Sequence, residues 1–131
     1  MKIGEFSRKT GLSVYTIRFY EKIGLIPAPP RDASGHRVYS QDSLGWVNFL
    51  EQLNATGMKQ ADRVFYAKLR QQGDSTLTQR RWILEAHYKK ICADLERLQR
   101  TSQLMQRKIS HYRELEAKQE RKDDGCSGER P

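Results

Sequence analysis

The sequence predicts a mainly α-helical protein, in which a winged helix-turn-helix with a small β-hairpin wing precedes one long C-terminal helix. Three observations lead to this fold class. Two short helical stretches meet at Gly11, a proline-rich segment with a turn follows residue 26, and residues 78–122 contain neither glycine nor proline. We therefore expect a first domain over residues 1–75, a coiled-coil helix over 76–122 and a disordered tail over 123–131.

The first expected helix covers about residues 3–9, with Ile3 and Phe6 on one face. Gly11 suits a tight turn after it, because glycine tolerates the positive φ that a helix end needs. Ser13 can then accept hydrogen bonds from the free N–H groups of a second helix over about 14–22. This pair predicts a helix-turn-helix, whose second helix enters the DNA major groove.

The second helix carries Tyr15, Thr16, Arg18 and Tyr20 within six residues. Their hydroxyl and guanidinium donors and flat rings suit phosphates and base edges. The segment that follows contains Pro27, Pro29 and Pro30, which cannot continue a helix, since proline lacks the backbone donor and clashes with the preceding turn. Residues 32–35 then form a plausible turn, and we expect a small β-hairpin, the wing, around it.

Two further helices should complete the first domain. Ser40 can cap a helix over about 41–54, in which Leu44, Val47, Leu50 and Leu53 recur at helical spacing. A helix over about 59–71 follows Gly57. Together the four helices supply enough apolar residues for one small core.

Apolar residues of the last helix recur with alternating gaps of four and three, which indicates a coiled-coil seam. A helix this long has no core of its own to cover that stripe, so we expect a second copy to do so, in a two-fold dimer. Ser102 and Glu116 are the polar seam positions. The expected dimer-interface residues are Leu84, Tyr88, Ile91, Leu95, Leu98, Met105, Ile109 and Tyr112.

Charge and composition agree with a nucleic-acid partner. The chain has 24 Lys+Arg against 16 Asp+Glu, a formal charge of +8, and a pI near 9.7; a basic surplus suggests a polyanion. No apolar run approaches the roughly 18 residues of a membrane helix, the first residues lack the apolar core of a signal peptide, and two cysteines are too few for a disulfide framework. We expect a cytoplasmic protein without membrane contact.

The residues resemble the MerR family of bacterial transcriptional regulators. The matching stretches are 3–5 (IGE), 10–13 (TGLS), 16–21 (TIRFYE), 24–26 (GLI), 35–39 (GHRVY), Asp42 and 57–58 (GM). The resemblance implies a winged-helix homodimer joined by an antiparallel coiled coil. It also implies binding to double-stranded promoter DNA between two promoter elements, which the regulator bends and untwists so that RNA polymerase engages both; this is recognition through DNA deformation.

Matched residue by residue, the resemblance implies recognition-helix contacts from Thr16, Arg18 and Tyr20 and wing contacts from Arg37 and Tyr39. The full set of candidate DNA-binding residues is Ser13, Tyr15, Thr16, Arg18, Phe19, Tyr20, His36, Arg37 and Tyr39.

This sequence departs from the family pattern at several positions. Lys59 and Gln60 replace a usual proline and leucine, His36 and Phe19 replace tyrosines, and Arg63 stands where an apolar residue is expected. The helix over 59–71 is therefore expected either to pack less firmly or to turn Val64 and Phe65 inward.

The cysteines define the sensing alternatives. Family relatives bind metals through paired cysteines near the end of the dimer helix, but here only Cys126 lies there, and one thiolate makes a poor closed site. We expect no metal site and no cofactor. Cys92 is a candidate thiol sensor, since Lys89 and Lys90 would favour its thiolate, although a spectator cysteine is the favoured interpretation.

The sequence contains no catalytic motif, so an enzyme is not expected. Two alternatives to a transcriptional regulator remain: an architectural or excisionase-like DNA-bending protein without promoter activation, and a helical adaptor acting through the coiled coil. The sequence names neither the operator nor the effector.

Overall fold

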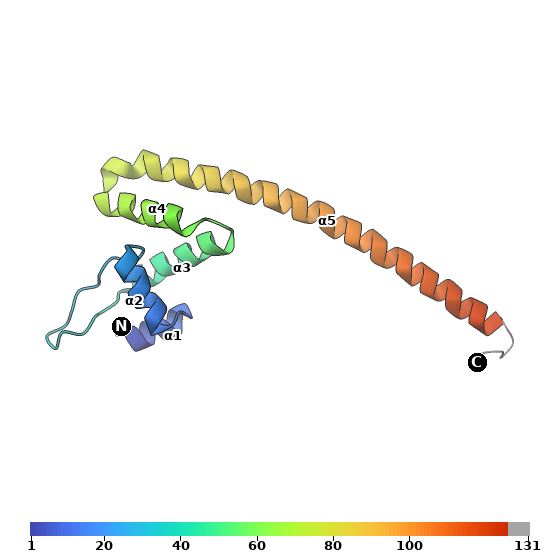
Figure 1. Cartoon of the computed structure of the whole chain (residues 1–131), viewed down its shortest axis with the longest axis horizontal. Helices are drawn as coiled ribbons and strands as arrows, with labels where there is room; N and C mark the ends of the chain where they lie inside the picture. The colour runs from blue at the N-terminus through green and yellow to red at the C-terminus, as the bar shows by residue number, and fades with distance from the viewer. Residues whose placement is uncertain (126–131) are drawn as a thin grey trace. The chain divides into compact units, whose positions relative to one another are not determined.

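The computed structural model describes residues 1–125, and within them every regular element is a helix (Figure 1). The α-helices are α1 (Ile3–Thr10), α2 (Val14–Ile23), α3 (Gln41–Ala55), α4 (Gln60–Gln72) and α5 (Leu77–Gly125), and a short 3-10 helix, η1 (Asp74–Thr76), precedes α5. These bounds confirm the five expected helices. The helix α5 also includes residues 123–125, which were expected in the tail, whereas the rest of that tail, with Cys126, lies outside the described residues.

The chain divides into two units, Met1–Tyr88 and Lys89–Pro131. The first unit contains α1 to α4 and also the first turns of α5, beyond the boundary expected at residue 75. The physical reason is packing: Ile83 and Leu84 of α5 lie against the core, and the His87 ring is hydrogen-bonded through Nε2 to Thr56 Oγ1 at 2.7 Å. In the described part of the second unit, α5 is the only element.

The turn between α1 and α2 has the expected geometry. Gly11 adopts the left-handed conformation with φ of 75°, and its N–H donates to the Ser7 carbonyl at 3.0 Å. Ser13 Oγ accepts from the Thr16 N–H at 3.0 Å and so caps α2. A residue with a side chain at Gly11 would be strained at that φ, so the sequence signal at this turn has a direct structural cause.

The core of the first unit joins α1, α2, α3, α4 and the chain on both sides of the wing. The Phe6 and Tyr39 rings stack with centroids 4.2 Å apart, and Trp46 Nε1 donates to the Leu25 carbonyl at 2.8 Å. The buried core cluster consists of Phe6, Ile17, Leu25, Ile26, Tyr39, Trp46, Val47, Leu50, Tyr66 and Ala67. Because Ile17 is fully buried in it, the opposite face of α2 is directed outward.

The wing segment differs from the expected β-hairpin. Arg31 and Arg37 form one isolated antiparallel bridge, and the described residues contain no β-strand. The three prolines before it limit the ladder, since each lacks a donor. The turn is closed instead by Asp32, whose Oδ1 accepts from the N–H groups of Ser34 and His36, each at 2.9 Å. The bond from His36 N–H is the first cause of the lowered pKa of the Asp32 carboxyl.

Helix α4 buries Arg63, the residue that departs from the family pattern, and does not turn both Val64 and Phe65 inward. Val64 is partly buried, but Phe65 is 55% exposed, so of the two alternatives the one that turns both side chains inward is wrong for Phe65. Arg63 itself is 5% exposed; its Nε donates to the Met58 carbonyl at 3.3 Å and its Nη2 to Asn54 Oδ1 at 3.4 Å. A buried guanidinium requires such acceptors, and they lie at the turn between α3 and α4.

Candidate nucleic-acid interface

The outward face of α2 presents several of the expected DNA-binding side chains. Tyr15 is 78% exposed, and Arg18 and Phe19 also reach the surface. At the start of the helix, Ser13 Oγ donates to Thr16 Oγ1 at 2.9 Å while it caps the backbone. These two hydroxyl groups thus lie together at the positive end of the helix dipole, where anions are favoured.

A basic pocket of about 260 Å³ lies between α2 and the wing segment. Arg18 and Lys22 line it from α2, and Arg31 and Arg37 line it from the wing. Four cations around one small depression favour a phosphate, which guanidinium groups can bind through paired hydrogen bonds. The guanidinium of Arg31 also donates to the Gly35 carbonyl at 2.6 Å, which orients it along the turn.

Glu21 is the acidic residue that lines this pocket. One carboxylate oxygen accepts from the Tyr39 hydroxyl at 2.7 Å, and the other pairs with Arg37 Nε at 3.0 Å. Only 8% of the Glu21 side chain is exposed. Glu21 therefore ties α2 to the wing segment and sets the position of Arg37. Glu21 lies in the stretch 16–21 that resembles the family, but sequence reasoning does not count it among the DNA contacts because it is acidic. Its position between Arg18 and Lys22 is the sequence signal that could have found it.

Tyr39 is a core residue in the structure, which corrects its assignment as a wing contact. It is 2% exposed, its ring stacks on Phe6, and its hydroxyl is directed to Glu21. Burial is the largest cause of the raised pKa of Tyr39, and the bond to the Glu21 carboxylate raises it further. Tyr39 thus anchors the end of the wing segment to α1 through Phe6 and to α2 through Glu21.

Tyr20 is partly buried, and its hydroxyl donates to Glu51 Oε1 of α3 at 3.2 Å. Burial raises its pKa first and the charge of Glu51 second. His36 stays at the tip of the wing turn, exposed, with Nδ1 3.7 Å from Asp32 Oδ1. Of the nine candidates, the structure brings Arg18 and Arg37 to one pocket, leaves His36 apart at the tip, and turns Tyr39 away.

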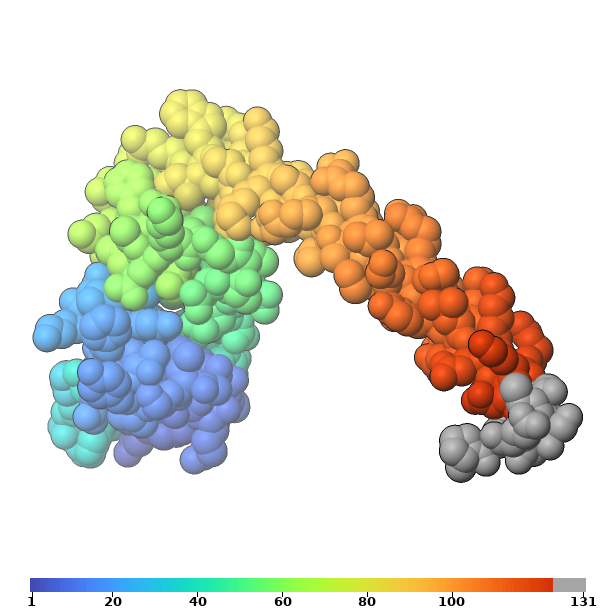
Figure 2. Space-filling model, turned by 45° about the vertical axis from the view of Figure 1, so that its right-hand side comes forward, coloured from blue at the N-terminus to red at the C-terminus, as the bar shows by residue number. Residues whose placement is uncertain are grey.

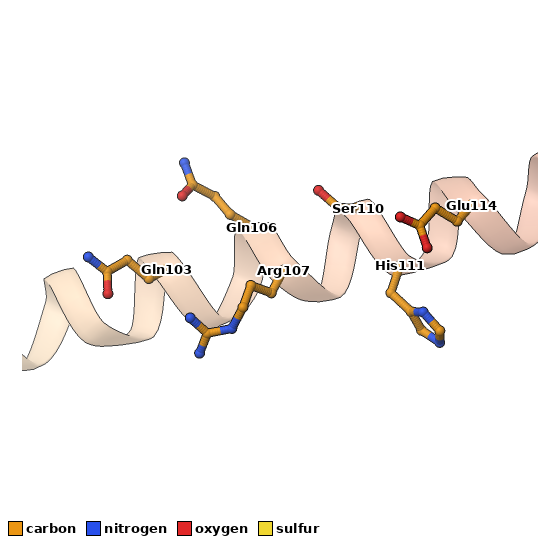
Figure 3. Close-up of a pocket in the computed structure, with 6 residues that line it drawn as sticks. All are labelled: Gln103, Gln106, Arg107, Ser110, His111 and Glu114. Atoms are coloured by element: carbon orange, nitrogen blue, oxygen red, sulfur yellow. The ribbon is translucent and has the colours of Figure 1, made fainter.

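The expected seam lies along one face of α5. Tyr88, Leu95, Leu98, Met105, Ile109 and Tyr112 are all exposed, whereas Leu84 and Ile91 are partly covered. Figure 3 shows a neighbouring polar stripe of α5, built by Gln103, Gln106, Arg107, Ser110, His111 and Glu114. The helix is thus divided lengthwise into an apolar and a polar side, which is the pattern of a helix that packs on a partner.

Figure 2 shows the part of α5 from about residue 90 to residue 125, coloured orange to red, as one extended helix. Near the start of α5, the seam face is open as a groove of about 430 Å³. Leu77, Arg81, Leu84 and Tyr88 line it from α5 and Tyr66 from α4. These α5 residues continue the seam spacing; the first unit covers Leu84 in part and leaves Leu77 and Tyr88 exposed.

Cys92 is exposed and forms no disulfide bond within the described residues. Among the residues that the structure describes, no three His, Cys, Asp or Glu side chains are grouped so that they could hold a metal ion. Over that same part of the chain, no helix combines the length and apolar character needed to span a membrane.

The model of the MerR family regulatory protein matches residues 2–39. An uncharacterized HTH-type transcriptional regulator of Haemophilus influenzae is 33% identical over 111 residues, which cover 85% of this chain and 82% of the relative. The mercuric resistance operon regulatory protein of Bacillus cereus is 34% identical over 107 residues, covering 76% of this chain and 77% of that one.

Two solved structures resemble the whole fold. HiNmlR, a MerR family regulator lacking the sensor domain and bound to promoter DNA, shares 32% sequence identity at a TM-score of 0.80, with 88% of this chain and 92% of that chain covered. A putative MerR family transcriptional regulator from Listeria monocytogenes shares 31% identity at a TM-score of 0.86, with 96% and 97% covered.

Proposed function

The chain belongs to the MerR family of regulatory proteins, and we propose that it is a dimeric, sequence-specific transcriptional regulator that binds double-stranded promoter DNA. The observation that carries the proposal is the basic pocket, in which Arg18 and Lys22 of α2 meet Arg31 and Arg37 of the wing segment. HiNmlR, which shares the fold, is bound to promoter DNA in its crystal structure. The curated relatives of this chain are transcriptional regulators rather than enzymes.

In this proposal α2 enters the major groove and the wing segment follows the phosphate backbone. Exposed Tyr15, Arg18 and Phe19, with Ser13 and Thr16 at the helix start, supply contacts to base edges and phosphates. His36 and Arg37 supply backbone contacts from the wing, although it contains a single β-bridge. Tyr20 and Tyr39 act indirectly, by holding α2 and the wing through Glu51 and Glu21.

The exposed seam of α5 supports a homodimer. Six large apolar side chains along it are solvent-exposed in the single chain, and burying each would contribute roughly 1.5–3 kcal/mol. A two-fold partner offers the same face and covers both seams at once. The family resemblance makes this pairing an antiparallel coiled coil.

We further propose the family mechanism: the dimer binds between two promoter elements, bends and untwists that DNA, and lets RNA polymerase engage both elements. Deformation of DNA contributes to recognition at base pairs that the protein does not touch. A protein with this target acts in the cytoplasm. The alternative, an architectural DNA-bending protein without promoter activation, would use the same surface.

Footprinting and a salt titration test the proposal together. We expect protection centred within a promoter spacer and a linear fall of log K with log salt concentration, because bound phosphates release counterions. Protection outside promoters, with the same salt slope, would favour the architectural alternative. An affinity unchanged between low and moderate salt would contradict DNA binding through the basic pocket.

A further inference from the structure

The charged residues of the seam of α5 carry information about how two copies align. The spacing that places Leu84, Ile91 and Leu98 on the seam assigns them to position d of a heptad, and Tyr88 and Leu95 to position a. The same repeat puts Arg81 and Glu116 at position a, near opposite ends of the helix. Both lie where a coiled coil normally buries apolar side chains.

A parallel coil would bring each of these residues against its own copy. Arg81 would face Arg81 and Glu116 would face Glu116, so that like charges meet in the seam, which is unfavourable. An antiparallel coil instead brings the Arg81 end of one helix to the Glu116 end of the other. The seam charges therefore favour the antiparallel orientation independently of the family resemblance.

The flanking positions then select one antiparallel alignment. In an antiparallel coil, position e faces position e of the partner, and g faces g. Position e holds Glu85 and Arg113, and position g holds Asp94 and Lys108. We propose that two copies of this chain pair antiparallel about residue 100, so that Glu85 lies beside Arg113 of the partner subunit and Asp94 lies beside Lys108 of the partner subunit.

The same alignment gives a consistent seam. Leu95 meets Met105 of the partner subunit, Ile91 meets Ile109 of the partner subunit, and Tyr88 meets Tyr112 of the partner subunit. At the end of the coil, Glu116 of the partner subunit meets Leu84, which lies one turn after Arg80 and Arg81 in the same groove. Glu116 thus lies where the groove offers cations, whereas Ser102 stays in the middle of the coil, against Leu98 of the partner subunit.

Sliding one helix by a heptad in either direction loses these matches. In one direction Glu85 faces Gln106 and Asp94 faces Thr101, without any opposite charge. In the other, Glu85 faces Glu120, and Glu116 is buried against Ile91, which is costly for a carboxylate. A single exposed ion pair contributes little to the choice of alignment. Two-fold symmetry, however, forms each ion pair twice, and neither shifted alignment retains any of these pairs.

Ion pairs already present on α5 are compatible with this alignment. Glu85 Oε1 pairs with Arg81 at 2.7 Å, and Asp94 pairs with Lys90 at 3.0 Å and Arg97 at 3.2 Å. A base from the partner would extend each into a network, the arrangement in which exposed charges contribute most.

The alignment rests on the proposed dimer, and native Cys92 at an e position offers a direct test. In the proposed alignment Cys92 faces Gln106 of the partner subunit, whereas a shift of seven residues separates these two positions by about 10 Å along the helix axis. In the full chain carrying Cys126→Ser, we expect Gln106→Cys to give a covalent dimer with a bismaleimide shorter than that shift, and peptide mapping to show a 92–106 link.

The control variants mark the neighbouring alignments. Arg113→Cys reports one shift, through a 92–113 link. Gln99→Cys reports the other, through a 92–99 link, while the proposed alignment gives a 99–99 link. A mapped 92–113 or 92–99 link, or no link for Gln106→Cys, would overturn the alignment. Sedimentation of each variant keeps the two proposals apart, because a monomeric protein would contradict the dimer itself.

A charge exchange provides a second readout. We expect Glu85→Arg to raise the dimer dissociation constant about tenfold, since two attractions become repulsions, and Arg113→Glu in the same chain to restore it. Glu114→Arg, at an outward position, is the matched control and should leave it unchanged. Failure of the double variant to recover would place the partner of Glu85 elsewhere and overturn the alignment.

Discussion

At the scale of single residues, Glu21 determines how the candidate interface is built. Its carboxylate accepts from Tyr39 at 2.7 Å and from Arg37 at 3.0 Å, although it lies among four cations. An acid at a site that we propose faces DNA would repel phosphates, so its presence has a structural reason. We expect these two contacts to hold the wing segment on α2 before DNA binds, which would lower the conformational entropy lost on binding.

Tyr39→Phe tests this support. We expect the free energy of unfolding to fall by about 1.5–3 kcal/mol, the range for a hydrogen bond to a charged group, measured by urea denaturation at neutral pH. Tyr15→Phe is the control, because that side chain is 78% exposed. Equal stability of Tyr39→Phe and the parent chain would show that the bond to Glu21 contributes nothing.

The stability difference between the parent chain and Tyr39→Phe should also depend on pH. The pKa of Tyr39 is raised in the folded state, so the unfolded chain loses this proton first as pH rises. Stability from the neutral phenol is therefore complete below the ordinary tyrosine pKa of about 10 and is lost above it. We expect the stability difference between the parent and Tyr39→Phe to shrink above that pH in urea titrations.

Arg18→Ala tests the interface itself. Arg18 is exposed on α2, so the circular dichroism spectrum should be unchanged, while affinity for all DNA sequences should fall by about 1–3 kcal/mol through loss of a charge-assisted contact. Fluorescence anisotropy with labelled duplex measures this. Arg100→Ala, on α5, is the control. Unfolding of Arg18→Ala would mean that the residue is structural.

At the scale of elements, α4 holds a cation in the position of an apolar side chain. Arg63 donates to Met58 and Asn54, yet its Nη1 is buried without a hydrogen-bond partner in the described structure. Incomplete satisfaction of a buried charge is destabilising. The two acceptors at the turn between α3 and α4 explain how the helix tolerates it.

Arg63→Met should therefore be tolerated. We expect a free energy of unfolding within about 1 kcal/mol of the parent or higher, because replacing buried charge with an apolar side chain of similar volume is often neutral or stabilising. Arg63→Ala, which leaves a cavity, should cost about 2 kcal/mol or more. A large loss in Arg63→Met would show that its hydrogen bonds, rather than its volume, hold α4.

The other element-scale prediction concerns α5. Leu95→Asp places a carboxylate in the seam, where it would be buried without a partner, which is strongly unfavourable. We expect sedimentation to show a monomer at micromolar concentration and DNA affinity to collapse, since one copy offers half the contacts. Gln103→Asp, on the polar stripe of Figure 3, should remain dimeric. A dimeric Leu95→Asp protein would locate the interface elsewhere.

At the scale of the whole molecule, the proposed function requires two copies acting together. Each copy carries one basic pocket, and a near-palindromic site presents two equivalent half-sites. The length of α5, Leu77–Gly125, separates the task of pairing from the task of reading DNA. We expect a signal that acts on this proposed dimer to be transmitted to the DNA-binding units along α5.

Cys92 is the residue where such a signal could enter by thiol chemistry, and it is exposed. We expect the spectator role: Cys92→Ser should bind DNA, dimerise and respond in a promoter-reporter strain as the parent does under metal, aldehyde and oxidant challenge. Loss of response with normal DNA binding would make Cys92 part of the sensor.

The sequence by itself determined the features that depend on local physics. Gly11 and Ser13 specify the turn and cap of the helix-turn-helix, and the spacing along α5 specifies its length and seam, because helix ends and helix periodicity are properties of short stretches. Only the tertiary structure decided the others. Tyr39 is drawn into the core by Phe6, Arg63 is buried by acceptors from another element, and Glu21 becomes the link to the wing; each depends on residues that folding alone brings together.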